Sequence, residues 1–199
     1  MERLARVVLA LALTGVVSIS ACGGDSDPAD TGVHDGGADA DADGDADADA
    51  DADAGDGCWI DPTTSLEWEV APDADLDWNG GVSRCEALAL CGKDDWSLPT
   101  IGELRSIIRG CAYTESTGSC PVSDGYTGTE SCAGCAHLGG PGSGGCYWPA
   151  SLGAPCSYYW SSSNAGPASV AWIVDFVNGD LFTIDTTYVF NVRCVRRGP

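Results

Sequence analysis

Residues 96–110 read WSLPTIGELRSIIRG and predict a helix with a defined beginning and a defined end. Thr100 and Glu103 stand three residues apart, so each side chain can accept a hydrogen bond from the other residue's backbone amide, as in a capping box. Pro99, just before the cap, biases the chain toward an extended approach. Gly110 is expected to end the helix, because glycine readily adopts the conformation that terminates helices.

The same segment also predicts which side of this helix is buried. Leu104, Ile107 and Ile108 recur at i, i+3 and i+4, which places them on one apolar stripe. Arg105 and Arg109 fall outside the stripe and near the negative end of the helix dipole. We therefore expect the stripe to pack on a core, with the two arginines away from it.

Residues 1–21 resemble the signal segment of bacterial lipoproteins. Two arginines precede a short apolar run over residues 7–17. This run is shorter than the roughly 20 residues that a membrane-spanning helix needs. Small residues precede Cys22, as in a lipobox, so we expect cleavage before Cys22 and lipidation of its thiol. The chain would then be anchored outside the cytoplasm, at the outer membrane or cell surface; the alternative is an ordinary secretory signal followed by a chance cysteine.

Residues 22–57 are a low-complexity linker that contains 13 Asp, mostly alternating with Ala. Such a segment has little apolar surface to bury and repels itself, so we expect a disordered tether. The spacing of Asp39, Asp41 and Asp43 resembles the start of a calcium-binding loop. The twelfth position of that loop is Ala50, however, which cannot act as the bidentate ligand. Loose association of cations is therefore a better interpretation than a structured calcium site.

Residues 58–199 are long enough for one compact domain with its own core. They carry seven Lys or Arg against 16 Asp or Glu, so the domain is strongly acidic. An acidic surface repels nucleic acid, sulfated polysaccharide and anionic lipid head groups. The expected partners are neutral, cationic or bridged by a cation, and nucleic acid is not among them.

The chain has 11 cysteines, and lipidation of Cys22 would leave an even ten in the domain. An even count outside the cytoplasm predicts five disulfides. A thiolate metal site is the alternative, although it competes poorly with oxidation. Its ligands would come from Cys132, Cys135, His137, Cys146 and Cys156. A redox-active Cys-x-x-Cys is less expected, because no strand-to-helix context surrounds it.

Hydrophobic periodicity predicts an α+β domain. A first helix is expected from Asn79 to Ala89 or Leu90, and the second is the helix described above. Strands are expected at 58–60, 66–70, 158–162, 170–177, 181–184 and 188–195. Asn178-Gly179 is a preferred hairpin turn between two of them. Residues 111–156 show no periodicity and contain most of the cysteines, so we expect disulfides to hold this loop region.

Four motifs in this order resemble the Lcl C-terminal domain family, which is named after a collagen-like bacterial surface adhesin. They are WSLPT with Glu103-Leu104, YWSS at 159–162, AWIVDF with Gly179, and VRCVR at 192–196. The resemblance implies a C-type-lectin-like α+β fold, similar also to sulfatase-modifying domains. It would have two helices, a small antiparallel sheet joining the termini, and long loops, here stapled by disulfides. The founding adhesin is associated with sulfated glycans, which do not suit this acidic domain, so we do not transfer that ligand.

In that fold the cysteine of the first helix meets the final strand, so the resemblance implies a Cys85–Cys194 disulfide. Proximity in the sequence suggests the remaining pairs. These are Cys58–Cys91, Cys111–Cys120, Cys132–Cys135 and Cys146–Cys156.

The expected function is non-enzymatic binding or adhesion to a glycan, peptide or matrix component through the long loops. Aromatic side chains offer flat faces to sugar rings, and carboxylates bind hydroxyl groups or calcium. The candidate ligand-binding residues are Tyr113, Asp124, Tyr126, Glu130, Tyr147 and Trp148. For Tyr147 and Trp148 the competing interpretation is burial beneath a stapled loop. Trp96, Trp160 and Trp172 are expected in the core.

Two alternatives to a binding function are an enzyme and a structural envelope protein. An oxidase like the sulfatase-modifying relatives needs reactive free thiols, whereas the ten cysteines of this domain can all pair in five disulfides. A hydrolase is also not expected, because His137 is the only histidine of the domain and has no evident Ser or Asp partner. We therefore expect no catalytic residue and no cofactor, with calcium as the one candidate metal. The other alternative is a structural envelope protein without a discrete ligand.

Overall fold

The structure, a computed structural model, describes residues 57–198. The expected lipidation residue Cys22 and the candidate calcium ligands Asp39, Asp41 and Asp43 lie outside the described residues, as do the signal segment and nearly all of the linker. Within the described part of the chain, neither helix has the length and apolar character needed to cross a membrane.

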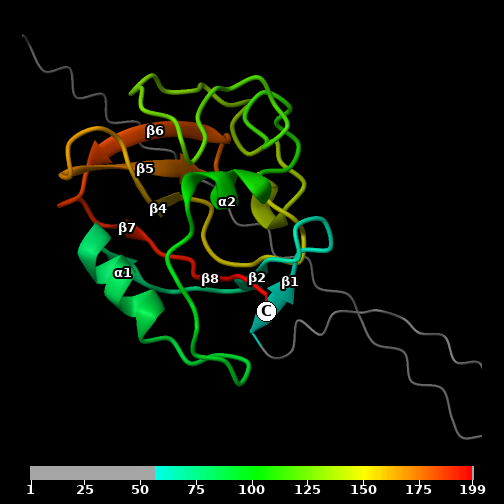
Figure 1. The fold of residues 1–199 in the computed structure, drawn as a ribbon. Helices are drawn as coiled ribbons and strands as arrows, with labels where there is room; N and C mark the ends of the chain where they lie inside the picture. Colours follow the sequence, from blue (N-terminus) through cyan, green and yellow to red (C-terminus); the bar gives the residue numbers. More distant parts are fainter. Residues whose placement is uncertain (1–56, 199) are drawn as a thin grey trace, which may run out of the picture. The chain divides into compact units, whose positions relative to one another are not determined.

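The fold contains two small sheets and two α-helices, so the expected α+β class is confirmed. The first sheet has the order β1-β2-β8, with β1 Cys58–Ile60, β2 Glu67–Glu69 and β8 Val195–Arg196. It places the first and last strands of the described residues together on either side of β2 (Figure 1). This is the expected small sheet that joins the ends of the domain.

The second sheet has the order β3-β7-β4-β5-β6. Its strands are β3 Asp75–Leu76, β7 Phe190–Asn191, β4 Tyr158–Asn164, β5 Val170–Asp175 and β6 Asp180–Asp185. The β5–β6 hairpin turns at Asn178-Gly179 as expected, and Gly179 has the positive φ of 77° that favours glycine. In Figure 1 the loop region that precedes β4 in the sequence arches over the β5–β6 side of this sheet.

The expected single strand over residues 188–195 is wrong. This segment divides into β7 and β8, which belong to different sheets. Between them Val192 donates its amide to Ala74 O at 3.0 Å, the Arg193 side chain enters the core, and Cys194 forms a disulfide. These tertiary contacts take the chain out of one ladder and into the other.

The first helix, α1 Trp78–Glu86, begins and ends earlier than expected. Asp77 rather than Asn79 caps it, and its carboxylate accepts a hydrogen bond from the Gly80 amide at 2.7 Å. Ala87 already lies outside the helix as its C-cap. The cap therefore comes from the residue whose acceptor is best placed for the free amides of the first turn.

The second helix, α2 Ile101–Ser106, has the expected capping box between Thr100 and Glu103. It ends at Ser106, four residues before the glycine that was expected to end it. The reason is tertiary, because the Arg109 amide donates to Tyr147 O at 3.1 Å instead of continuing the helix.

Arg105 also differs from the prediction, because its side chain is buried. The guanidinium donates to Thr114 O at 3.0 Å, to Glu115 O at 2.7 Å and to Val122 O. It therefore supplies hydrogen bonds to the backbone of a loop that has few partners of its own.

The five-stranded sheet has a hydrophobic cluster on each face. On one face α2 packs with Tyr159, Trp172 and Trp148. On the other face α1 packs with Trp96 and Trp160 around the Cys85–Cys194 disulfide. Trp96, Trp160 and Trp172 are all buried, which confirms their expected place in the core.

Five disulfides link the ten cysteines of the described residues. Three have the expected partners: Cys58–Cys91, Cys85–Cys194 and Cys146–Cys156. The expected Cys111–Cys120 and Cys132–Cys135 pairs are wrong, because the structure joins Cys111 to Cys135 and Cys120 to Cys132. The chain folds back on itself between residues 111 and 135. The backbone of Cys132 forms an isolated β-bridge with Leu181, and the Cys135 amide donates a hydrogen bond to Asn178 O. The two bonds are therefore nested, and cysteines that are neighbours in the sequence are not bonded to each other.

Candidate functional site

The structure does not gather the six expected ligand-binding residues into one site. Tyr147 and Trp148 are 2% and 0% exposed and belong to the core, so they are not part of a binding surface. Trp148 packs against Phe176 at 5.0 Å and lies beneath the Arg193 guanidinium. Tyr147 donates its hydroxyl to Ala136 O at 2.7 Å and holds the loop above it. Burial under the stapled loop, the competing interpretation, describes both residues.

The other four residues lie closer to solvent but in separate roles. The Tyr126 hydroxyl donates to Glu130; this bond raises the pKa of Tyr126 and lowers that of Glu130. Asp124 accepts a hydrogen bond from the Gly102 amide at 2.7 Å and so adds a second acceptor at the start of α2. Tyr113 is 43% exposed, and its carbonyl binds the Cys120 amide. None of these four lines the hollow described next.

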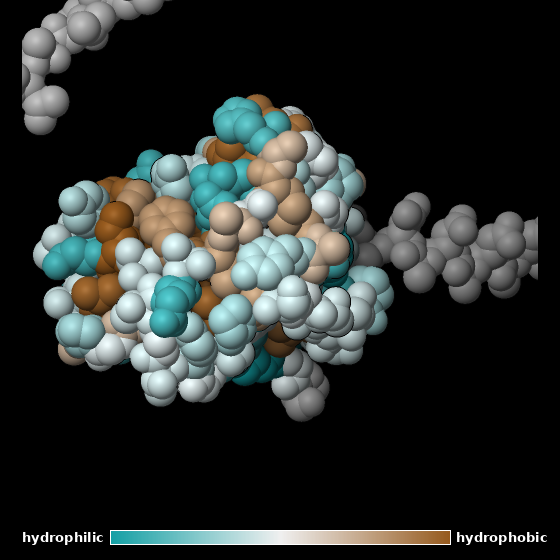
Figure 2. Space-filling model, turned by 90° about the horizontal axis from the view of Figure 1, so that it is seen from above, coloured by the Kyte–Doolittle hydropathy of each residue, from teal (hydrophilic) through white to brown (hydrophobic). Residues whose placement is uncertain are grey.

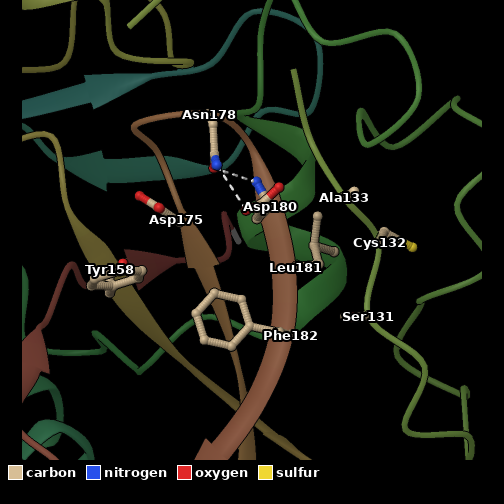
Figure 3. A pocket seen from close by; sticks show the side chains of 9 residues that line it. All are labelled: Ser131, Cys132, Ala133, Tyr158, Asp175, Asn178, Asp180, Leu181 and Phe182. Atoms are coloured by element: carbon tan, nitrogen blue, oxygen red, sulfur yellow. Dashed lines mark hydrogen bonds between the residues drawn. The ribbon is translucent and has the colours of Figure 1, made fainter. Parts of the chain in front are cut away.

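A hollow of about 470 Å³ lies at the end of strands β4, β5 and β6. The aromatic side chains of Tyr158 and Phe182 form one part of its wall, and Asp175, Asn178 and Asp180 form a polar part beside the β5–β6 turn (Figure 3). Residues 131–133, from the loop that runs beside β6, complete its rim.

Strand register explains why these side chains meet. Tyr158 pairs with Asp175 and Asp175 pairs with Asp180, so the three residues form a row across three strands. Residues that are directly opposite one another in a sheet share a face, and so do residues two apart along a strand. Phe182 therefore lies on the same face as Asp180, and the aromatic and acidic groups line one concave surface.

The hydrogen bonds at the polar end fix both aspartates. Asp180 accepts a hydrogen bond from the Asn178 side-chain amide at 2.7 Å (Figure 3). It accepts another from the Gly134 amide, which ties the loop to the turn. Asp175 accepts a bond from the Val177 amide at 2.9 Å through Oδ1. Within residues 57–198 nothing donates a hydrogen bond to its Oδ2.

Asp175 is 7% exposed, although it is a charged residue in an otherwise apolar strand. Burial raises the pKa of its carboxyl group, and the nearby Asp180 charge reinforces this shift, whereas the Val177 amide and the nearby His137 oppose it. A buried carboxylate without a cation is costly to keep ionised. The hollow therefore contains an acceptor that the domain itself leaves only partly satisfied.

Aromatic rings continue from the hollow along the neighbouring strands. The Tyr158 ring lies 5.8 Å from Phe182, edge to face, and 5.3 Å from Phe190. Tyr188 stacks on Phe190 at 6.2 Å and is 55% exposed, whereas Tyr158 is 38% exposed. Seen from the side of β6 and the loop region, apolar patches alternate with polar ones (Figure 2). Together these rings form an aromatic surface that leads to the acidic end of the hollow.

The positive charges of the described residues are all neutralised or buried. Salt bridges hold five of the seven cations, and Arg105 and Arg193 are buried against backbone carbonyls. The five are Arg84, Lys93, Arg109, Arg196 and Arg197. These bridges use five of the 16 carboxylates of residues 57–198, which leaves 11 without a Lys or Arg partner. The acidic groups of the hollow belong to this unpaired majority.

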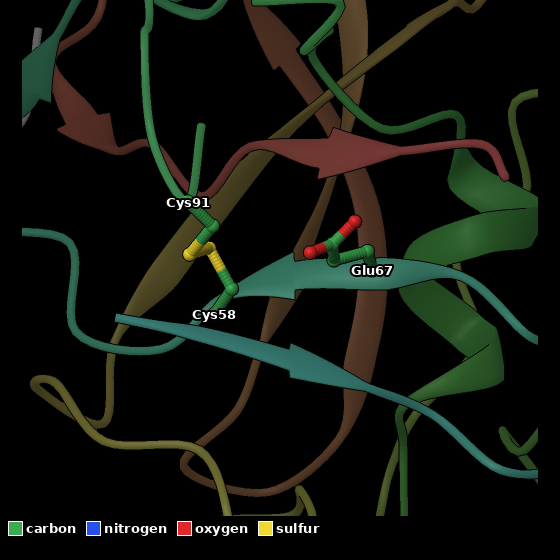
Figure 4. Close-up of side chains that lie close together, drawn as sticks. All are labelled: Cys58, Glu67 and Cys91. Carbon is green, nitrogen blue, oxygen red and sulfur yellow. A yellow bond between two sulfur atoms is a disulfide. The ribbon is translucent and has the colours of Figure 1, made fainter. Parts of the chain in front are cut away.

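One further group of potential metal ligands lies close together, at Cys58, Glu67 and Cys91 (Figure 4). The two sulfur atoms are bonded to each other as a disulfide. Glu67 already binds Lys93 at 2.7 Å and Arg196 at 3.2 Å. This group is therefore a structural crosslink beside an ion pair and offers no free thiolate to a metal.

His137 lines a second hollow, of about 520 Å³, beside the Cys146–Cys156 disulfide. The structure shows no hydrogen bond from its imidazole to residues 57–198. The metal-ligand set that combined His137 with four cysteines is wrong, because all four sulfur atoms are in disulfides.

The sequence interpretation missed Tyr158, Asp175, Asp180 and Phe182 as a group, because each was assigned only to a strand. One signal was present. Asp175 interrupts the apolar run VAWIVDFV, and a carboxylate in a buried strand needs a structural or functional reason.

Residues 57–196 match the sequence model of the Lcl C-terminal domain. No curated protein matches the chain.

Proposed function

Because the chain belongs to the Lcl C-terminal domain family, we propose that it is a lipid-anchored surface protein whose C-terminal domain binds an extracellular ligand without catalysis. The ligand would be a glycan, a peptide or a matrix component. Two helices, a small sheet joining the ends of the domain and long stapled loops support a C-type-lectin-like architecture. Lipidation at Cys22 and display at the outer membrane or cell surface complete the proposal.

The observation that carries this proposal is the hollow between the aromatic pair and the acidic row. Ligand sites are typically concave and combine apolar walls with a few well-placed polar groups. Here Tyr158 and Phe182 supply the apolar wall, while Asp175, Asn178 and Asp180 supply the polar groups. The hydrogen bonds of Asp180 hold the rim in place, which reduces the ordering cost of binding.

A non-catalytic role agrees with the cysteine chemistry. All ten cysteines of the described residues are in disulfides, whereas oxidase chemistry of the sulfatase-modifying kind needs reactive thiols. Titration of the purified protein with a thiol reagent tests this part. One or more reactive thiols in the domain would contradict it.

The five disulfides also support display outside the cytoplasm, because such a number is typical of proteins in oxidising environments. Intact-mass analysis of the mature chain tests the anchor. A lipid-modified Cys22 at the N-terminus is expected, and an unmodified Cys22 would remove the lipoprotein assignment.

The binding proposal is tested with the full mature chain, purified in detergent with its disulfides intact. The protein is applied to arrays of glycans, peptides and matrix proteins, and Tyr158→Ala is compared with Tyr113→Ala. Both substitutions remove a similarly exposed tyrosine, but only Tyr158 lines the hollow.

We expect Tyr158→Ala to weaken binding by tenfold or more and Tyr113→Ala to leave it unchanged. Circular dichroism and mass analysis of the disulfides verify that both variants fold. Equal effects of the two substitutions, or no effect of either, would show that the hollow is not the ligand site.

A further inference from the structure

We propose that the hollow binds the lysine side chain of a protein or peptide partner, with the ammonium group between Asp175 and Asp180. This inference rests on the proposed function, because it identifies the group that the same hollow recognises. Three features of the described residues support it: the unpaired carboxylates, the aromatic wall, and the charge of the surrounding surface.

Asp175 and Asp180 pair directly across β5 and β6, which places their side chains roughly 5 Å apart at Cβ. Neither has a Lys or Arg partner among residues 57–198, and Asp175 is 7% exposed. Oδ2 of Asp175 also lacks a donor from these residues. Two carboxylates in one hollow repel each other unless a proton or a cation lies between them.

An ammonium group satisfies this arrangement. It is compact, carries a positive charge and has three hydrogen-bond donors, so it can bind both carboxylates at once. A neutral sugar hydroxyl can bind one carboxylate but leaves the repulsion between them in place. The charge-assisted bonds to an ammonium are also the stronger ones.

The aromatic wall suits the rest of a lysine side chain. The rings of Tyr158 and Phe182 meet edge to face at 5.8 Å, and both line the hollow beside the acidic row. Lysine commonly lays its methylene chain along apolar surface while its charged end makes polar contacts. An ammonium near an aromatic face gains a further cation–π attraction.

The surrounding charge favours the same partner. The described cations are paired or buried, so no free Lys or Arg of residues 57–198 repels a basic ligand at the hollow. The 11 unpaired carboxylates among the 16 of these residues attract it at longer range. Charge complementarity therefore selects a basic protein segment over an acidic or sulfated one.

The test uses the full mature chain in detergent, with disulfides intact, and three end-blocked pentapeptides. The peptides are Gly-Gly-Lys-Gly-Gly, the same peptide with an acetylated lysine, and the same peptide with arginine in place of lysine. Binding is followed by NMR shift titration at low salt. We expect the lysine peptide to bind, and acetylation to weaken binding by at least tenfold.

A matched pair of variants separates the hollow from the general field of the domain. Asp175→Asn removes one negative charge inside the hollow and keeps an acceptor for the Val177 amide. Asp185→Asn removes one negative charge from the exposed end of β6, outside the hollow. Asp175→Asn should weaken binding of the lysine peptide by about tenfold, as expected for one lost charged hydrogen bond, and Asp185→Asn by less than twofold.

The outcomes separate this inference from the proposed function. If acetylated and unmodified peptides bind equally and Tyr158→Ala weakens both, the hollow is a ligand site but does not recognise ammonium. The same conclusion follows if only a neutral glycan binds there, or if the arginine peptide binds tenfold more tightly than the lysine peptide. If no probe or array ligand depends on Tyr158 or Asp175, both the inference and the proposed function are wrong.

Discussion

A single charged residue, Asp175, connects the stability of this domain with its proposed function. It occupies the last position of a strand whose other residues are apolar. Its carboxylate accepts one backbone hydrogen bond, from the Val177 amide, and has no Lys or Arg partner within residues 57–198. Binding sites commonly retain such destabilising groups, because the ligand supplies the missing interaction.

This view predicts that Asp175→Asn stabilises the protein at neutral pH. Burial raises the folded-state pKa of Asp175 above its unfolded value, so the ionised carboxylate opposes folding at pH values above the folded pKa. Asparagine keeps the acceptor for Val177 without the charge. The melting temperature of the variant should exceed that of the wild type at pH 7.

The difference should shrink as the pH falls through the folded pKa, because the wild-type carboxyl then becomes neutral in the folded state. It should vanish below the unfolded pKa of about 3.9, where both states are protonated. Calorimetric scans at several pH values provide the measurement, with Asp94→Asn, which removes an exposed carboxylate, as the control. A variant that melts below the wild type at pH 7 would contradict the assigned cost of burial.

At the scale of the element, the six-residue helix α2 depends on its ends more than on its length. A helix this short is not stable alone, since nucleation is costly and few hydrogen bonds follow it. The Thr100 hydroxyl accepts the Glu103 amide at 3.1 Å, and the Glu103 carboxylate accepts the Thr100 amide at 2.8 Å. Glu103 also binds Arg197 near the C-terminus, so the cap links α2 to the end of the chain.

Thr100→Ala should therefore lower the free energy of unfolding by about 1 kcal/mol, because the Glu103 amide loses its acceptor. Thr100→Ser keeps the hydroxyl oxygen and should stay within about 0.5 kcal/mol of the wild type, a typical surface change. Urea denaturation of the oxidised protein measures both. If serine proves as damaging as alanine, the methyl packing of Thr100 matters and the cap does not.

For the molecule as a whole, disulfides contribute according to the length of chain they close. Cys85 and Cys194 are 109 residues apart and join α1 to the segment before β8, whereas Cys146 and Cys156 are 10 residues apart. In the chain-entropy model, the long loop restricts the unfolded chain by about 4.7 kcal/mol and the short loop by about 2.7 kcal/mol. The long crosslink is therefore expected to contribute more to the stability of the domain than the short one.

We expect the double substitution Cys85→Ser and Cys194→Ser to cost more stability than Cys146→Ser with Cys156→Ser, by about 2 kcal/mol. Chemical denaturation of both double variants gives the comparison. Each pair is removed completely, so no free thiol can exchange with the remaining disulfides. A larger loss from the short loop would mean that local packing around Cys146 outweighs loop closure.

Much of the fold could be predicted, because it depends on interactions over a few residues. The cap of α2, the hairpin at Asn178-Gly179, the buried tryptophans and the α+β class all follow from local spacing and apolar periodicity. The candidate site could not be predicted in the same way. Its residues come from three strands, and only the register of Tyr158, Asp175 and Asp180 places them in one row.

By itself, the sequence determined the acidic character of the domain and its even number of cysteines. It also determined where local hydrogen bonds start helix α2 and where the chain turns at Asn178-Gly179. Only the tertiary structure decided that Cys111 bonds to Cys135, that Arg105 supports a loop, and that Tyr147 and Trp148 are core residues. The physical reason is distance along the chain. Capping and turns are short-range interactions, whereas these contacts join segments whose approach depends on how the entire core packs.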